Sequence, residues 1–195
     1  GALSTKAVKD GSDYVLEGTK CFITNAGPHE GDYFVVFAVT DPEKKTHGGM
    51  TAFIVDRDNP GLSIGKTEDK MGIRGSKTSE VILENCRVPE TAIIGKIGEG
   101  FKIAMASLDG GRIGIASQAV GIAEAALAEA VKYANERVQF GKPIAAKQGL
   151  QWYIAEMATK VEAAKLLVLQ AADLRARGEN CSKQAAMAKY FAADT

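Results

Sequence analysis

The pattern of apolar and polar positions divides the chain into two halves of different character. In the first half the two classes alternate with a period of two, which is typical of half-buried strands, and one run is almost continuously apolar. Turn signals rich in Gly, Asn, Asp and Pro separate these segments. Short strands at this spacing predict an antiparallel β-barrel or sandwich. The expected strands are Tyr14 to Lys20, Tyr33 to Thr40, Met50 to Asp56, Leu62 to Lys66 and Glu80 to Cys86.

After Gly100 the apolar residues recur every three or four positions, as in helices. A first helix is expected from Phe101 to Arg137. A second is expected over about 145–177 with Gly178 as its stop, and a third from Ser182 as N-cap, still running at the last residue. The first helix is expected to present one apolar face made of Ile115, Ala119, Ile122, Ala126 and Ala130.

The predicted fold class is therefore α+β. An antiparallel β-barrel or sandwich domain in residues 1–95, incomplete at its start, is followed in residues 96–195 by long antiparallel helices of a four-helix bundle. Because no stop signal closes the third helix, we expect the bundle to be incomplete at its end.

Charge and cysteine content narrow the possible partners. Basic and acidic residues both number 24, so the net charge is zero and gives no electrostatic reason to expect nucleic acid or an anionic membrane. By eye, no apolar run reaches the ~18 residues of a membrane span. Cys21, Cys86 and Cys181 are scattered and odd in number, which argues against a disulfide framework or a zinc site and suits a reducing compartment.

One segment, Gly18 to Ala26, combines a strand end with groups that a flat ligand could use. The strand ends in the polar pair Thr24-Asn25, and Phe22 lies just before it. Such an edge could present a hydroxyl, backbone N–H groups and an aromatic wall. An ordinary turn beside a core phenylalanine accounts for the same residues, so these residues alone leave both interpretations open.

Three further segments carry candidate chemistry. Arg137, followed by Gln-Phe-Gly, offers a guanidinium for a phosphate, or merely complements a helix C-terminus. Asp109 and Arg112 lie three residues apart on one helix face, which fits either a surface ion pair or a polar pair at the mouth of a cleft. Met71 to Ser76 is a glycine-flanked loop before a strand, and it lacks the spacing of a dinucleotide-binding motif.

The order of four segments along the chain is similar to that in the acyl-CoA dehydrogenases, in particular the short-chain, butyryl-CoA type. These segments read GTKCFITNA, EDKMGIRGSKTSEVILENCRVPE, GEGFKIAMASLDGGRIGIASQAVGIAEAAL and YANERVQFGKPIAAKQ. The resemblance implies an FAD enzyme that desaturates a short straight-chain acyl-CoA between Cα and Cβ. It also implies a homotetramer built as a dimer of dimers, with electrons passing to electron-transferring flavoprotein, in a bacterial cytoplasm or a mitochondrial matrix.

The same resemblance assigns roles to residues. By it, Phe22 packs on the flavin ring and Thr24 hydrogen-bonds near flavin N5. Asp109 and Arg112 line the acyl-CoA channel, where the arginine contacts the pantetheine. The residues expected to reach the FAD of a neighbouring subunit are Arg137, Gln139, Phe140 and Gln148.

The resemblance also implies that no catalytic residue lies in this chain. The family's Thr-Glu-Pro motif and the Tyr-Glu-Gly motif that carries the base are absent from the sequence. Some members place the base at the position of Gly111, and glycine cannot serve. The base is therefore expected beyond Thr195, and residues 1–195 alone are expected to be inactive. Alternatives are an acyl-CoA oxidase or nitroalkane oxidase on the same scaffold, or a non-catalytic folding or assembly module.

Overall fold

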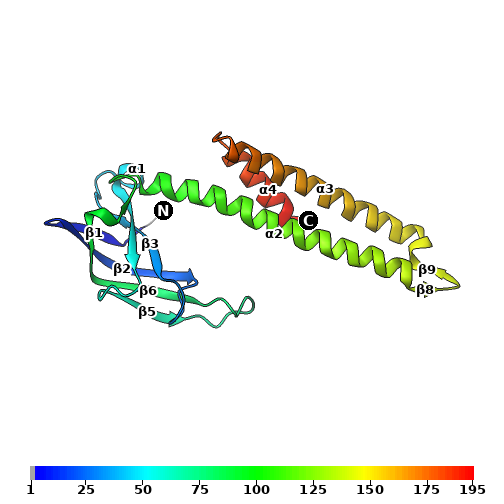
Figure 1. The fold of residues 1–195 in the computed structure, drawn as a ribbon, viewed down its shortest axis with the longest axis horizontal. Helices are drawn as coiled ribbons and strands as arrows, with labels where there is room; N and C mark the ends of the chain where they lie inside the picture. The colour runs from blue at the N-terminus through cyan, green and yellow to red at the C-terminus, as the bar shows by residue number, and fades with distance from the viewer. Residues whose placement is uncertain (1–2) are drawn as a thin grey trace. The chain divides into compact units, whose positions relative to one another are not determined.

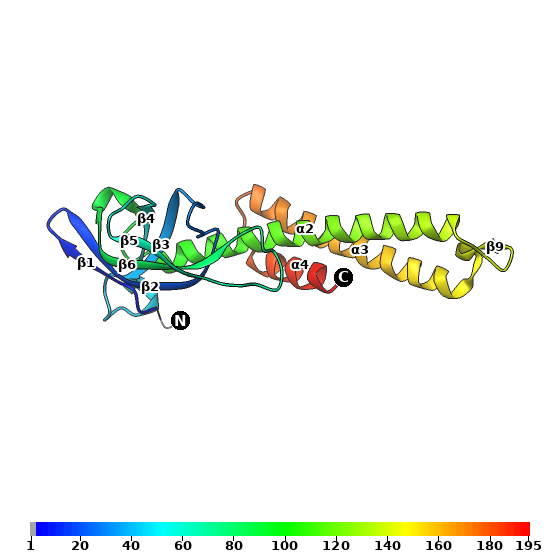
Figure 2. The ribbon, with the colours of Figure 1, turned by 90° about the horizontal axis from the view of Figure 1, so that it is seen from below.

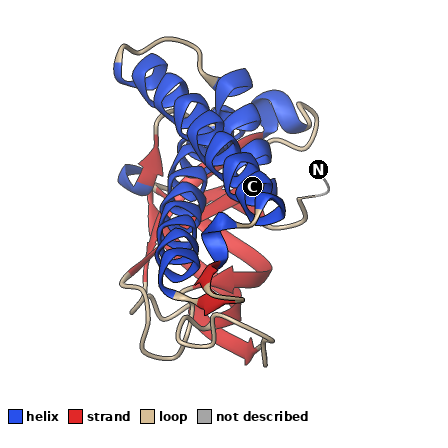
Figure 3. Cartoon of the chain, turned by 90° about the vertical axis from the view of Figure 1, so that its right-hand side faces the viewer, coloured by secondary structure: helices blue, strands red, loops and turns tan. Residues whose placement is uncertain are grey.

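The structure is a computed structural model that describes residues 3–195. The chain divides into two compact units, Gly1–Met105 and Ala106–Thr195. Figure 3 shows the two kinds of secondary structure: the strands of the main sheet belong to the first unit, and the long helices continue into the second. The two units are described separately below.

The first unit contains a seven-stranded sheet with the strand order β5-β6-β2-β1-β3-β4-β7. All strand pairs are antiparallel except β1 with β3, which pair in parallel at Lys6 and Val39, so the sheet is mixed and not purely antiparallel as predicted. A short helix, α1 (Thr46–Gly49), precedes β4, and one helical turn (Glu90–Ala92) precedes β7. The strands, labelled in Figure 1, are β1 (Lys6–Asp10), β2 (Asp13–Thr24), β3 (Tyr33–Val39), β4 (Met50–Asp56), β5 (Leu62–Thr67), β6 (Thr78–Pro89) and β7 (Ile93–Ile94).

The sheet bends around a single apolar core. Leu62 of β5 lies near one end of the strand order and Phe53 of β4 near the other, yet both belong to the same buried cluster. The ring centroid of Phe53 lies 5.3 Å from that of Tyr14, and Leu16 and Leu83 of the same cluster are almost completely buried. A strand order whose two ends contribute to one core requires a strongly curved sheet.

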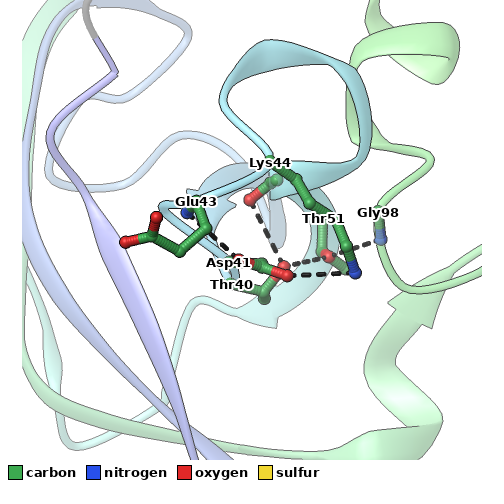
Figure 4. A network of polar contacts seen from close by, with 7 residues as sticks. Thr40, Asp41, Glu43, Lys44, Thr51 and Gly98 are labelled. Atoms are coloured by element: carbon green, nitrogen blue, oxygen red, sulfur yellow. Dashed lines mark hydrogen bonds and ion pairs between the residues drawn. The ribbon is translucent and has the colours of Figure 1, made fainter.

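Two threonine hydroxyl groups link the β3–β4 connection to the segment that leads into the first long helix (Figure 4). The hydroxyls of Thr40 and Thr51 lie 2.8 Å apart, and the Thr51 oxygen accepts a 3.0 Å hydrogen bond from the backbone N–H of Gly98. Asp41 next to this network pairs with Lys44, and that hydrogen-bonded ammonium lowers the pKa of the Asp41 carboxyl. Thr51 is fully buried, so each of its hydrogen bonds replaces one lost to water.

The second unit is built from long helices joined by a short hairpin. Helix α2 (Gly100–Glu136) begins in the first unit and ends at the hairpin β8 (Val138–Gln139) and β9 (Lys142–Pro143). A helical turn (Ile144–Ala146) leads into α3 (Gln148–Ala176), which runs back alongside α2, and α4 (Ser182–Asp194) packs with them (Figures 1 and 2). Gly178 ends α3 in a left-handed conformation with φ 72°, as predicted.

The buried face of α2 differs from the predicted one. The buried residues that α2 contributes to the core with α3 and α4 are Ile113, Ala116 and Val120. Of the predicted face, Ala119 packs against this core, whereas Ile115 and Ile122 are exposed. Alanine, glycine and isoleucine occur all around this helix, so the spacing of apolar residues does not single out one face.

By length and composition, α2 is long and apolar enough to cross a membrane, contrary to what the sequence predicted. Core helices of soluble proteins can have the same length and composition. The α2 residues packed against α3 and α4 are small or branched apolar residues, as expected in such a bundle.

Candidate functional site

A bulge near the end of β2 turns an aromatic side chain away from the sheet. The pairing of β2 with β6 shifts between Lys20 and Ile23, so Cys21 and Phe22 have no partners. Phe22 takes a left-handed backbone conformation, with φ 58°, and 73% of its surface is exposed. Bulges of this kind redirect side chains and are frequent next to functional sites. The predicted alternative of a core phenylalanine is therefore wrong.

The polar turn after the bulge is held rigidly. Asn25 is also left-handed, its N–H donates to the carbonyl of Lys77 at 2.8 Å, and its side-chain oxygen accepts a hydrogen bond from Ser76 at 2.6 Å. Arg57 fixes the next residues by donating to three carbonyl oxygens of the loop from Gly27 to Glu30, at 2.6–2.9 Å. Within residues 3–195 no group hydrogen-bonds with the hydroxyl of Thr24, which is exposed at the strand end. A fixed turn with a free hydroxyl suits ligand binding.

The tip of the hairpin between α2 and α3 presents a second aromatic side chain in the same strained conformation. Phe140 and Gly141 both have positive φ, at 54° and 74°, which is the backbone of a two-residue hairpin turn. The first of these positions normally favours Asn, Asp or Gly. Phe140 is 91% exposed, and the ammonium of Lys147 lies 4.5 Å from its ring centroid. The turn therefore displays an aromatic ring bordered by positive charge.

The predicted polar residues around this tip are available to a ligand. Arg137 follows the last residue of α2, and its side chain makes no hydrogen bond or ion pair within residues 3–195. Gln148 begins α3 and is exposed, while the side chain of Gln139 donates to the neighbouring carbonyl of Val138. A free guanidinium beside an exposed ring suits a ligand with a phosphate and a flat apolar part.

Asp109 and Arg112 form an ion pair on α2, with 2.8 Å between Oδ1 of the aspartate and Nη1 of the arginine. The sequence did not predict that the hydroxyl of Ser182 donates a 2.5 Å hydrogen bond to the other aspartate oxygen. The sequence predicted Ser182 as the N-cap of α4, and this is wrong. Ser182 is the first residue of the helix, and Cys181 occupies the cap position. In the sequence, the one sign of this contact is that a serine stands at a predicted helix start. That position does not indicate which residue the serine contacts.

The predicted site residues are divided between the two units and, within the second unit, between two distant places. Phe22 and Thr24 belong to the first unit, and the other predicted site residues belong to the second. Arg112 in α2 and Arg137 just after its end are 25 positions apart, which corresponds to about 37 Å along a straight helix. A ligand bound at the hairpin tip is thus distinct from one bound near Arg112 of the same chain.

Burial perturbs two titratable groups close to the bulged strand. Burial lowers the pKa of Lys20 to about 8, and its ammonium donates to the carbonyl oxygen of Phe37. Burial and the nearby charge of Glu17 raise the pKa of the Cys86 thiol to about 11, which makes this cysteine a poor nucleophile. Among residues 3–195 no group of three His, Cys, Asp or Glu side chains is arranged to hold a metal ion.

Two family models match almost the whole chain. The middle domain of acyl-CoA dehydrogenases matches residues 1–86, and the C-terminal domain matches residues 98–195. An acyl-CoA dehydrogenase of Bacillus subtilis is 55% identical over 194 residues, which is all of this chain and 50% of that protein.

Two further comparisons agree with this match. A subunit of the caffeyl-CoA reductase–Etf complex of Acetobacterium woodii is 50% identical over 194 residues, covering 100% of this chain and 50% of its own length. The solved structure of butyryl-CoA dehydrogenase from Megasphaera elsdenii superposes with a TM-score of 0.91 at 48% identity, covering 98% of this chain and 50% of that one. The chain therefore spans about half the length of the relatives it matches.

Proposed function

Because the chain belongs to the acyl-CoA dehydrogenase family, we propose that it forms part of an enzyme that desaturates short straight-chain acyl-CoA thioesters. The family depends on FAD, and the likeness to a butyryl-CoA dehydrogenase supports the short-chain substrate. We also propose residues 1–95 and 96–195 as its middle β-domain and part of its helical domain. Its cellular location remains a prediction.

The exposed ring of Phe22 next to the free hydroxyl of Thr24 is the observation that carries this proposal. The ring would pack on the flavin and the hydroxyl would hydrogen-bond it near N5. FAD held there would supply the acceptor for the hydride that leaves Cβ of the substrate. The turn that follows Thr24 is fixed by the hydrogen bonds of Asn25, so the backbone of this strand end is ordered before a ligand binds, which favours binding.

The hairpin tip would hold the FAD of a neighbouring subunit, with Arg137 on the pyrophosphate and Gln139, Phe140 and Gln148 around it. The length of α2 supports binding across subunits, because within one subunit this tip lies about 37 Å along the helix from Arg112. The exposed apolar residues Ile115 and Ile122 on α2 suit contact with further helices. We therefore propose a homotetramer built as a dimer of dimers.

Asp109 and Arg112 would lie along the acyl-CoA channel, and the base that takes the α-proton would come from outside residues 3–195. At Gly111 an added Cβ would meet no atom within 4 Å, so this position offers space but no carboxylate. The carboxylate of Asp109 already accepts hydrogen bonds from Arg112 and Ser182 on its two oxygens. A base needs a free oxygen beside the reacting carbon, and Asp109 does not supply one.

Electron-transferring flavoprotein is the proposed electron partner, which the likeness to a subunit of a reductase–Etf complex supports. That likeness also favours a second candidate, reduction of an enoyl-CoA, which is the same chemistry in reverse. Anaerobic flavin absorbance in the full-length enzyme separates the two, by comparing the rate at which butyryl-CoA bleaches the oxidised flavin with the rate at which crotonyl-CoA reoxidises flavin that dithionite has reduced. Rapid oxygen consumption without an electron partner would instead indicate an oxidase.

The cofactor assignment is tested in the full-length enzyme by Arg137→Ala. The matched control is Lys132→Ala, which removes an exposed positive charge slightly earlier on α2. We expect the Arg137 variant to lose FAD during gel filtration and the control to retain it. Equal FAD content in both variants would contradict the assignment of Arg137.

The assignment of the base is tested with residues 1–195, FAD and butyryl-CoA under anaerobic conditions. We expect no bleaching of the flavin at an enzymatic rate, and bleaching would mean that a carboxylate of this chain is the base. In a full-length enzyme without its own catalytic glutamate, Gly111→Glu should restore part of the activity, since the position is open but the geometry differs.

A further inference from the structure

The carboxylate of Asp109 is fixed from two sides by residues of different helices. Arg112 on α2 binds Oδ1 at 2.8 Å, and Ser182 at the start of α4 binds Oδ2 at 2.5 Å. Only 14% of the aspartate side chain is exposed, against 41% for the arginine. The buried member of the pair is thus the aspartate, and the member open to a ligand is the arginine.

An ion pair between residues three apart on one helix does not by itself hold an arginine in one orientation. Such exposed pairs contribute little, because long side chains lose rotamer freedom when they pair. A second hydrogen bond from another helix removes the remaining freedom of the aspartate. Hydrogen bonds to a charged carboxylate are also stronger than those between neutral groups. With Asp109 fixed, the Arg112 guanidinium is fixed through it.

The orientation of Arg112 leaves it donors for a ligand. A guanidinium has five N–H donors, and Asp109 takes up one nitrogen of Arg112 within residues 3–195. The guanidinium of Arg175 packs against Gly110, with atoms 2.8–2.9 Å from where a Cβ would be, next to Asp109 in the sequence. Because Asp109 engages only one nitrogen of Arg112 within residues 3–195, the other N–H groups of Arg112 are available to a ligand.

We propose that Ser182 is a positioning residue for acyl-CoA binding, which it serves by fixing Asp109 and, through it, Arg112. This inference rests on the proposed function, in which Arg112 contacts the pantetheine part of the substrate. Ser182 does not touch the substrate, and its hydroxyl acts through the carboxylate.

The test uses two variants of the full-length enzyme that differ by a single hydroxyl, Ser182→Thr and Ser182→Val. The steady-state KM and kcat for butyryl-CoA and the thermal unfolding midpoint are measured for each. We expect the threonine variant to match the wild type. The valine variant should raise KM about three- to tenfold with kcat changed less than about twofold, because a binding contact is misaligned while the chemistry is intact.

The single variant Arg112→Ala tests the substrate contact of the proposed function. The double variant with Ser182→Val tests whether Ser182 acts through Arg112. We expect Arg112→Ala to raise KM, and Ser182→Val to add nothing in that background, since both act through one contact. If Arg112→Ala raises KM and Ser182→Val does not, or if the two effects multiply, Ser182 has no positioning role although the substrate contact stands. An unchanged KM in Arg112→Ala would overturn the substrate contact and the proposal with it. A lower unfolding midpoint with unchanged KM in Ser182→Val would show a purely structural link.

Discussion

The ammonium group of Lys20 on β2 donates a 2.6 Å hydrogen bond to the carbonyl oxygen of Phe37 on β3. The two strands are not neighbours in the sheet, because β1 lies between them and is paired with β2 only as far as Glu17. Lys20 pairs with the buried residue Val81, so its side chain lies on the core side of the sheet and crosses beyond the end of β1. The lysine thus bridges an opening in the curved sheet.

The burial of Lys20 predicts that its contribution to stability rises with pH in the alkaline range. Burial lowers the pKa of Lys20 from 10.5 to about 8 in the folded state, so between these values the unfolded chain binds more protons. The free energy of unfolding therefore increases as pH rises from about 8 to 10.5. The free energy of unfolding of the wild type and of Lys20→Met is measured by urea unfolding from pH 7 to pH 10. As the pH rises, the wild type should gain stability relative to the variant. The exposed Lys6→Met is the control, and a constant difference for Lys20→Met would contradict the prediction.

The cysteines should differ in reactivity although all three are reduced. Raising the pKa of Cys86 from 9.0 to about 11 lowers its thiolate fraction at pH 8 about a hundredfold. Iodoacetamide at pH 8, followed by peptide mass spectrometry, should modify the exposed Cys21 first and leave Cys86 unmodified. In urea all three should react. Modification of Cys86 as fast as Cys21 in the folded protein would mean that the β-unit opens readily.

Two adjacent glycines of α2 should respond differently to alanine. A Cβ at Gly111 meets nothing within 4 Å, whereas at Gly110 it lies 2.8 Å from the guanidinium of Arg175. Gly111→Ala should stabilise the chain by about 1 kcal/mol through helix propensity. Gly110→Ala should gain less, since Arg175 must move. Thermal unfolding of residues 1–195 measures both, and an equal gain would show that Arg175 is not held against α2.

Replacing the aromatic residue of the bulge should separate stability from cofactor binding. Phe22 is exposed and its backbone is left-handed, a conformation that costs a residue with a side chain about 1 kcal/mol. Glycine adopts it without that cost, and Phe22→Gly removes little core contact. The chain should be as stable as the wild type or more stable, while the full-length enzyme should retain less FAD. Tyr33→Gly is the matched control, an exposed aromatic in a regular strand, and it should be destabilising. A large loss of stability in Phe22→Gly would mean that the ring packs within the protein.

The sequence by itself determined the elements whose cause is local. Strand β4 spans Met50–Asp56 as predicted, because its apolar and β-branched run is bounded by turn residues on both sides. Helix α2 and the stop at Gly178 likewise follow from spacing and from the conformational freedom of glycine. The order of four motifs indicated the family, which the two family models confirm.

What depends on contacts between distant residues was decided only by the tertiary structure. Strand β1 has little apolar character of its own and exists because it pairs with β2. The buried face of α2 is selected by where α3 and α4 pack, since apolar residues occur on several of its faces. Ser182 reaches Asp109 across 73 positions, and no local pattern encodes such a pair. Local preferences act over a few residues, whereas packing joins residues that the chain itself keeps far apart.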